Sequence, residues 1–164
     1  MPETLFPRTR QALLTPIAIL EGLGARYRLA RKDIHVADWN DIERRFGKSP
    51  EGRVRAYARL RHLYELAERT GALLRFIVFG SFVSEITAPR DIDVVLVMAT
   101  DFRLEEAPRE SRTLFSHPDA EARFGASIFW VREGMLPDEM MQSVLEAWQT
   151  KRDGTTRGIV EIKP

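Results

Sequence analysis

Two short apolar segments constrain the fold of this chain more than any other feature. Leu73 to Phe79 is rich in β-branched and aromatic residues, which indicates a buried strand. Asp91-Ile-Asp93 opens a second strand, Val94 to Met98, which is apolar on both faces and is therefore central in its sheet. The first strand ends at Gly80-Ser81. The chain therefore contains a sheet with at least two buried strands.

Helical patterns precede these strands. Asp38 is suited to the N-cap of a helix that ends at Gly47 and has Trp39, Ile42 and Phe46 on one face. A second helix is predicted from Ser49-Pro50 to Thr70-Gly71. Its apolar stripe comprises Val54, Tyr57, Leu60, Leu63, Tyr64, Leu66 and Ala67, whereas Arg53, Arg55, Arg59 and Arg61 lie largely off that stripe. The second helix is therefore expected to pack by one face and to have a basic outer face.

The remaining segments complete the predicted order of elements. Residues 99–123 are polar and acidic and read as a long connection, and a third strand follows at Ala126 to Val131. A closing helix is expected over Pro137 to Arg152, and Ile159 to Ile162 is expected to form a short terminal or edge strand. These elements predict an α/β (α+β) fold, a mixed sheet flanked by helices.

The N-terminal region has the weakest pattern. Thr15-Pro16 can cap a short helix over Ile17 to Leu23, and the following residues are rich in arginine. We therefore expect a partly helical arm at residues 1–35 and one domain at residues 36–164.

Composition excludes several kinds of protein. The chain has no cysteine and only three histidines, which excludes disulfide scaffolds and thiolate zinc sites. No apolar run is long enough to cross a bilayer, and no signal-peptide pattern is present, so we expect a cytoplasmic protein without a membrane partner. Residues 1–75 carry 15 basic and 9 acidic side chains, a net +6, while the remainder carries a net −5. This asymmetry is compatible with an anionic ligand or with two surfaces that pair with each other.

The turn between the first two strands contains the residues best suited to chemistry. Gly80 permits a sharp exit and a close backbone approach, and Ser81 offers a hydroxyl group. Because side chains alternate along a strand, Asp91 and Asp93 are expected on one face, with Ile92 in the core. Two carboxylates on one face repel each other unless a cation lies between them. Mg²⁺ with phosphate oxygens suits such a site.

The stretch GSFVSEITAPRDIDVVLV resembles the signature of the nucleotidyltransferase fold that includes DNA polymerase beta. It is most similar to small bacterial domains of the minimal nucleotidyltransferase and toxin–antitoxin type. This resemblance implies that Gly80 and Ser81 grip phosphate, and that Asp91 and Asp93 bind metal and are catalytic. It implies a two-ion Mg²⁺ site and ATP or another nucleoside triphosphate as substrate. The implied activity is transfer of a nucleotidyl group, often AMP, to a protein or RNA hydroxyl.

The chain departs from this family pattern at one position. Active members have a third carboxylate on a later strand, and the matching position here is Ser127. A neutral hydroxyl is a poor Mg²⁺ ligand and cannot accept a proton at neutral pH. Asp119, Glu121 and Glu133 could substitute for the missing carboxylate, but each is in a predicted loop and would need an unusual path to the site.

Three functions therefore remain open at this point. The first is a nucleotidyltransferase. The second is a catalytically degenerate binding protein, such as an antitoxin that contacts a toxin. The third is an RNA-binding accessory protein that uses the basic front half, including the arginines of the second helix.

Overall fold

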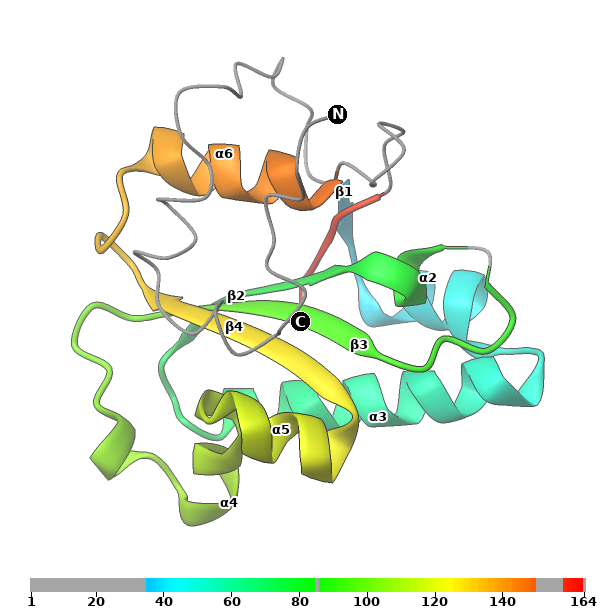
Figure 1. Cartoon of the computed structure of the whole chain (residues 1–164), viewed down its shortest axis with the longest axis horizontal. Coiled ribbons are helices and arrows are strands. Elements are labelled where there is room, and N and C mark those ends of the chain that lie inside the picture. Colours follow the sequence, from blue (N-terminus) through cyan, green and yellow to red (C-terminus); the bar gives the residue numbers. More distant parts are fainter. Residues whose placement is uncertain (1–34, 85, 150–157, 164) are drawn as a thin grey trace.

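The computed structural model describes residues 35–84, 86–149 and 158–163, which form a mixed five-stranded sheet with helices on both faces (Figure 1). The strand order is β1-β5-β2-β3-β4. The strands are β1 (His35–Ala37), β2 (Leu73–Phe79), β3 (Ile92–Met98), β4 (Ala126–Arg132) and β5 (Val160–Ile162). β2 runs antiparallel to both β3 and β5, while β3 pairs with β4, and β1 with β5, in parallel. The predicted mixed α/β fold is confirmed.

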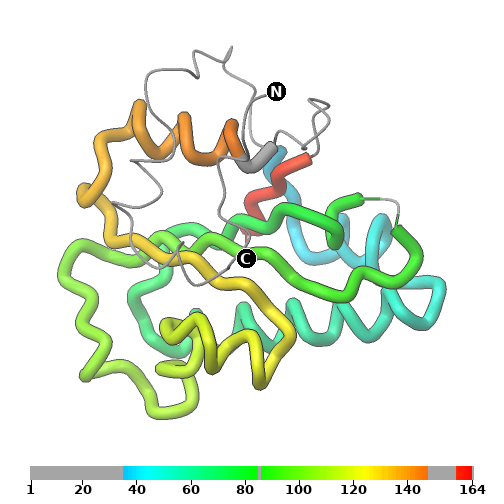
Figure 2. The backbone as a smooth tube through the Cα atoms, in the orientation of Figure 1, coloured from blue at the N-terminus to red at the C-terminus, as the bar shows by residue number. Residues whose placement is uncertain are grey.

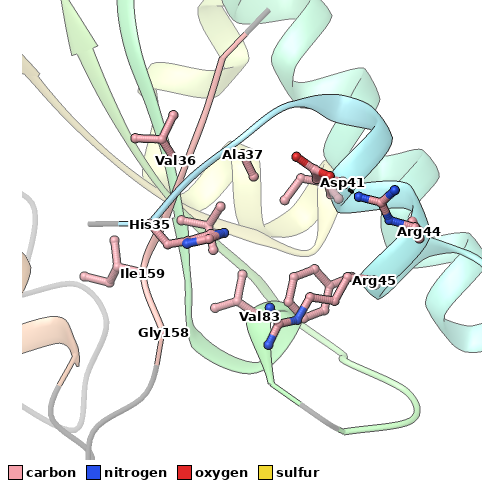
Figure 3. Close-up of a pocket in the computed structure, with 12 residues that line it drawn as sticks. His35, Val36, Ala37, Asp41, Arg44, Arg45, Val83, Gly158 and Ile159 are labelled. Atoms are coloured by element: carbon pink, nitrogen blue, oxygen red, sulfur yellow. Dashed lines mark hydrogen bonds and ion pairs between the residues drawn. The ribbon is translucent and has the colours of Figure 1, made fainter. Parts of the chain in front are cut away.

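The helices form one layer on each face of the sheet. Helix α3 (Glu51–Glu68) lies on one face with the shorter α4 (Arg109–Arg112) and α5 (His117–Phe124), and α6 (Asp138–Gln149) covers the other (Figure 1). Helix α2 (Trp39–Ile42) continues as a π-helical turn over Glu43–Gly47. This turn lines a pocket together with β1 (Figure 3). The Asp38 cap is confirmed, because its carboxylate accepts a hydrogen bond from the Asp41 backbone N–H at 2.8 Å.

Strand β3 shows how the side chains divide between the two layers. Val94 and Leu96 belong to the large core beneath α3, whereas Val95 belongs to a smaller cluster beneath α6. Both sets are buried because β3 has a strand on either side and a helical layer on either face. The prediction of a central, wholly apolar strand is therefore confirmed.

The prediction that residues 99–123 form only a long connection was wrong. This segment folds into α4, α5 and two 3₁₀ turns, Leu104–Glu106 and Thr113–Phe115. Pro108 and Pro118 stand at helix starts, where a missing N–H costs little. Phe102, Leu114 and Ala120 anchor the segment in the core.

The terminal strand is an interior strand. β5 lies between β1 and β2, and β1 forms the edge of the described sheet. Figure 2 shows the C-terminal strand in red beside the first described strand in blue. The closing helix is confirmed through Gln149. The helix expected over Ile17 to Leu23 and nearly all of the arm at residues 1–35 lie outside the described residues.

Most of the apolar stripe predicted for helix α3 is buried, namely Leu60, Leu63, Tyr64, Leu66 and Ala67. Two positions differ from the prediction. Arg53 is buried, with 5% of its surface exposed, whereas Val54, assigned to the apolar stripe, is 44% exposed. Arg53 precedes Ala56 by three residues and Leu60 by seven, so helical spacing places all three on one face. The assignment of Arg53 to the basic outer face was therefore wrong.

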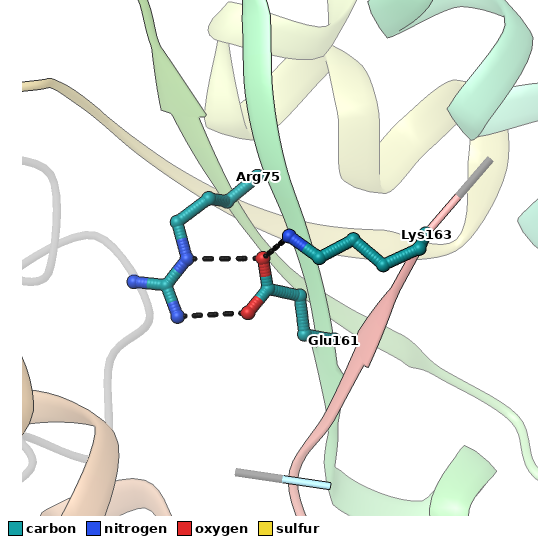
Figure 4. Close-up of polar contacts among 3 residues, drawn as sticks. All are labelled: Arg75, Glu161 and Lys163. Atoms are coloured by element: carbon teal, nitrogen blue, oxygen red, sulfur yellow. Dashed lines mark hydrogen bonds and ion pairs between the residues drawn. The ribbon is translucent and has the colours of Figure 1, made fainter. Parts of the chain in front are cut away.

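A buried carboxylate ties the C-terminal strand to β2. Glu161 accepts hydrogen bonds from Arg75 Nε at 3.1 Å, from Arg75 Nη2 at 2.9 Å and from Lys163 Nζ at 2.6 Å (Figure 4). Burial raises the pKa of Glu161, but the hydrogen bonds and positive charges of Arg75 and Lys163 outweigh it and leave the pKa below its usual range. The ionised form of Glu161 therefore stabilises the sheet.

We expect Glu161→Gln to lower the free energy of unfolding at pH 7 by about 2 kcal/mol, because the hydrogen bonds to charged partners are weakened. Because its pKa is lowered in the folded protein, Glu161 contributes stability above its ordinary pKa and loses it as pH falls through the folded value. Between pH 7 and pH 3, the free energy of unfolding measured in urea should therefore fall less in Glu161→Gln than in the wild type. Glu110→Gln is the control, since Glu110 pairs with Arg69 on the surface. Equal acid losses in the wild type and Glu161→Gln would count against this role.

No helix in the ranges that the structure describes combines the length and the apolar character needed to cross a membrane.

Candidate functional site

The turn after β2 places Gly80 directly against the side chain of Asp93. Gly80 begins a 3₁₀ turn, Gly80–Val83, and has a φ of +76°. A Cβ atom at this position would lie 2.2 Å from Asp93 Oδ2 and 3.1 Å from Asp93 Cγ. Two separate features therefore require glycine at position 80. The backbone conformation disfavours a residue with a Cβ atom, and the Asp93 carboxylate occupies the space that a side chain would need. Sequence reasoning attributed the need for glycine to phosphate, whereas the described contact is with Asp93.

Ser81 connects the turn to the other aspartate. Its hydroxyl donates a hydrogen bond to the backbone carbonyl of Asp91 at 3.2 Å. Asp91 precedes β3 by one residue, and Asp93 is the second residue of that strand. Ile92, between the two aspartates, is fully buried in the core beneath α3, as predicted from strand alternation. The structure thus brings Gly80, Ser81, Asp91 and Asp93 to one place.

Ser127 occupies the neighbouring position on the adjacent strand. In the parallel pairing of β3 with β4, Asp93 and Ser127 are register partners. Parallel register partners point to the same face of a sheet and lie one strand spacing apart, about 4.8 Å. Ser127 is buried, with 3% of its surface exposed. The position that the resemblance to nucleotidyltransferases matches to a third carboxylate is therefore beside Asp93 and holds a neutral hydroxyl.

The three acids considered as substitutes lie elsewhere. Glu133 follows the last residue of β4, at the end of that strand remote from Ser127. Asp119 and Glu121 are on α5, which packs through Ala120 into the core on the opposite face of the sheet from α6. None of these acids occupies the position next to Asp93. No group of three or more His, Cys, Asp or Glu side chains arranged to hold a metal occurs in residues 35–84, 86–149 and 158–163.

The donor chemistry of the site still suits a hard cation. Asp91 and Asp93 supply carboxylate oxygens, and Mg²⁺ is typically bound by one or two carboxylates plus phosphate oxygens and water. In the nucleotidyltransferase pattern that the sequence resembles, three carboxylates bind two ions. Asp91 and Asp93 supply two of these carboxylates, and Ser127 does not supply the third. The residues present therefore fit one Mg²⁺ ion that a phosphate ligand completes.

Arg53 holds the turn in place, and sequence reasoning missed this role. Its guanidinium donates hydrogen bonds to the backbone carbonyls of Phe82 and Ser84. It also lies near the rings of Phe46 and Phe82, at 5.7 Å and 5.9 Å from their centroids. Burial lowers the pKa of Arg53 from its usual value, yet an arginine remains charged at neutral pH. The sequence signal was its helical spacing to Ala56 and Leu60.

The other arginines of α3 also have partners within the protein. Arg59 donates to the carbonyls of Pro89 and Arg90, at 3.4 Å and 3.2 Å, at the far end of the loop that leads to Asp91. Arg55 pairs with Glu51 at 2.6 Å, and Arg61 lies 4.4 Å from the centroid of the Trp39 ring. Arg53 and Arg59 thus fasten the two ends of the loop between β2 and β3.

The aromatic residues near the site are core residues. Phe82 is fully buried and its ring centroid lies 5.8 Å from that of Phe46. Trp130 packs edge-on against Phe102 and Phe115. Both rings therefore pack in or against the large core beneath α3.

The comparisons with known proteins identify a family. Neither the search of curated proteins nor the search of solved structures gave a match. One family model, described as a family of unknown function (DUF6932), matches residues 24–163. That span covers most of the chain and includes every residue of the site described above. The chain belongs to the DUF6932 family.

Proposed function

We propose that this protein binds a nucleoside triphosphate, such as ATP, together with Mg²⁺ at a nucleotidyltransferase-type site. The observation that carries the proposal is the contact between Gly80 and the Asp93 carboxylate. It joins the glycine-serine turn that follows β2 to the two aspartates at the start of β3. Two acidic residues at the start of a central, otherwise apolar strand are typical candidates for a functional site.

Each residue of the site has a defined part in this proposal. Asp91 and Asp93 would hold Mg²⁺, which would offset the negative charge of the phosphates. Gly80 leaves room for the Asp93 carboxylate, and Ser81 fixes the backbone of Asp91. Arg53 orients the turn through the carbonyls of Phe82 and Ser84. We further propose a cytoplasmic location, because nucleoside triphosphates are made and used inside cells.

The activity that follows from such a site is nucleotidyl transfer to a protein or RNA hydroxyl. The acceptor oxygen attacks the α-phosphorus, the bond from that phosphorus to the pyrophosphate oxygen breaks, and pyrophosphate leaves. The proton of the acceptor hydroxyl must pass to a base. Because Ser127 cannot accept it at neutral pH, the base would be one of the two aspartates.

Ser127 also favours a second candidate function, a binding protein that does not transfer the nucleotide. A toxin is the partner proposed for it, contacted in the manner of an antitoxin. Incubation of the protein with α-labelled ATP, Mg²⁺ and an extract of its source cells separates the candidates. Label on a protein or RNA that disappears in Asp93→Asn favours the enzyme. Mg²⁺-dependent ATP binding without transfer of label favours the binding protein.

Calorimetric titration with ATP tests nucleotide binding directly. Binding of ATP to the wild type should require Mg²⁺, and Asp93→Asn should weaken it by at least about a hundredfold. Mutation of a residue that only hydrogen-bonds to a metal ligand already lowers metal affinity ~10–100-fold, and loss of a ligand should cost more. Asp101→Asn is the matched control, since Asp101 is exposed in the turn after β3, at the other end of that strand. ATP binding that is independent of Mg²⁺, or equal in the two variants, would reject the proposal.

A further inference from the structure

A cavity opens at the same end of the sheet as Asp93, and other residues line it. It measures about 770 Å³ and lies between β1, the start of β5 and the helical turn after α2 (Figure 3). Cavities that bind small molecules typically measure about 300–1,000 Å³. Its size alone therefore suits a ligand as large as a mononucleotide.

The cavity is positively charged. Arg44, Arg45 and His35 line it, and Asp41 is the acidic residue among the lining residues. Asp41 pairs with Arg44, so its charge is already matched. Arg45 lies 5.5 Å from the centroid of the Phe46 ring, and within residues 35–84, 86–149 and 158–163 no carboxylate lies within ion-pair distance of it. One guanidinium group therefore faces the cavity without a described counter-charge.

Apolar side chains form the rest of the wall. Val36, which is 54% exposed, comes from β1, Ile159 precedes β5, and Val83 ends the turn that starts at Gly80. A ligand bound here would therefore meet both cationic and apolar groups. This combination is typical of pockets that orient a small molecule with a few polar groups.

The topology keeps this cavity apart from the aspartates. β5 pairs with β2, and β2 pairs with β3, so the start of β5 lies two strand spacings from Asp93, about 10 Å. The cations of the cavity are arginines, which bind an anion without a metal. Binding in the cavity is thus separable from binding at Asp91 and Asp93.

We propose that this cavity binds a small phosphate monoester with an apolar body, independently of metal. Arginine is favoured over other cations for phosphate, because its planar fork makes two parallel hydrogen bonds. Arg45 and Arg44 would take the phosphate, and Val36, Val83 and Ile159 would contact the apolar part. The inference does not depend on the proposed nucleotide site.

The test uses the full chain in buffer with EDTA, titrated with adenosine 5′-monophosphate, inorganic phosphate and adenosine. We expect the monophosphate to bind at least about tenfold more tightly than either of the other two, a difference of ~1.4 kcal/mol. Arg45→Gln should weaken its binding by at least about tenfold. Arg103→Gln is the control, because it removes an exposed arginine that does not line the cavity. Arg103 pairs with Glu106 at i,i+3 spacing, as Arg44 in the cavity pairs with Asp41.

Asp93→Asn separates this inference from the proposed function. Metal-free binding of the monophosphate should be unchanged in Asp93→Asn, whereas Mg²⁺-dependent ATP binding should be lost there. The inference is overturned if the monophosphate does not bind without metal. It is also overturned if adenosine or inorganic phosphate binds equally well, or if Arg45→Gln and Arg103→Gln bind equally.

Discussion

Gly80→Ala should lower the free energy of unfolding by about 2–4 kcal/mol and weaken Mg²⁺-dependent ATP binding by at least about tenfold. A left-handed backbone costs a residue with a Cβ about 1–2 kcal/mol. The new methyl group would also overlap the Asp93 carboxylate, which has to rotate away. Because Asp93 is a proposed metal ligand, its displacement should reduce binding as well as stability. Urea unfolding and calorimetric titration measure the two effects.

Gly134→Ala is a closely matched control for this substitution. Gly134 has a φ of +80°, close to the +76° of Gly80, but a Cβ there would meet no atom of the described residues within 4 Å. The two variants therefore share the backbone strain, and only Gly80→Ala disturbs Asp93. Gly134→Ala should lose about 1–2 kcal/mol of stability and keep its ATP affinity. Equal ATP affinity in both variants would show that the contact with Asp93 has no role in binding.

Ser127→Asp should make the stability of the protein depend on Mg²⁺. In the absence of divalent ions the new carboxylate is buried next to Asp93, and we expect a loss of about 3 kcal/mol. Mg²⁺ should restore much of this stability, because a cation between the carboxylates removes their repulsion. Thermal unfolding with EDTA and with Mg²⁺ measures the difference. The variant should also show more label transfer from ATP if the missing carboxylate limits catalysis.

Ser127→Asn supplies the control, because asparagine has nearly the same shape as aspartate but carries no charge. Its melting temperature should respond to Mg²⁺ no more than that of the wild type. If Mg²⁺ raises the melting temperatures of Ser127→Asp and Ser127→Asn equally, then position 127 does not face the proposed metal site.

The strands were predictable because their signal is local. Leu73–Phe79 is rich in β-branched and aromatic residues, and Val94–Met98 is apolar on both faces, which a central position in a sheet accommodates. The strand pairing was not predictable in the same way. β1 and β5 have three residues each, and their pairing joins positions more than 120 residues apart, such as His35 with Val160. Nothing in either short segment specifies its partner, so β5 was expected to be terminal or an edge.

The proximity of the four candidate residues was predictable, but the contacts that hold them together were not. Gly80, Ser81, Asp91 and Asp93 follow from a turn and a strand that are close in sequence. The reason for glycine at position 80 depends on where the Asp93 side chain lies, which requires three-dimensional structure. Arg53 was interpreted as a surface residue because of its charge, although its spacing to Ala56 and Leu60 placed it on the buried face.

Paramagnetic NMR tests the location of the proposed metal–nucleotide site most directly. Mn²⁺ is added in place of Mg²⁺ together with a non-hydrolysable ATP analogue, and the backbone amide signals of the ¹⁵N-labelled full chain are recorded. We predict that the signals of Gly80, Ser81 and Asp93 broaden first and that the signal of Met98, at the other end of β3, persists. Broadening centred on Met98, or no analogue-dependent broadening at Gly80 and Asp93, would contradict the proposed location.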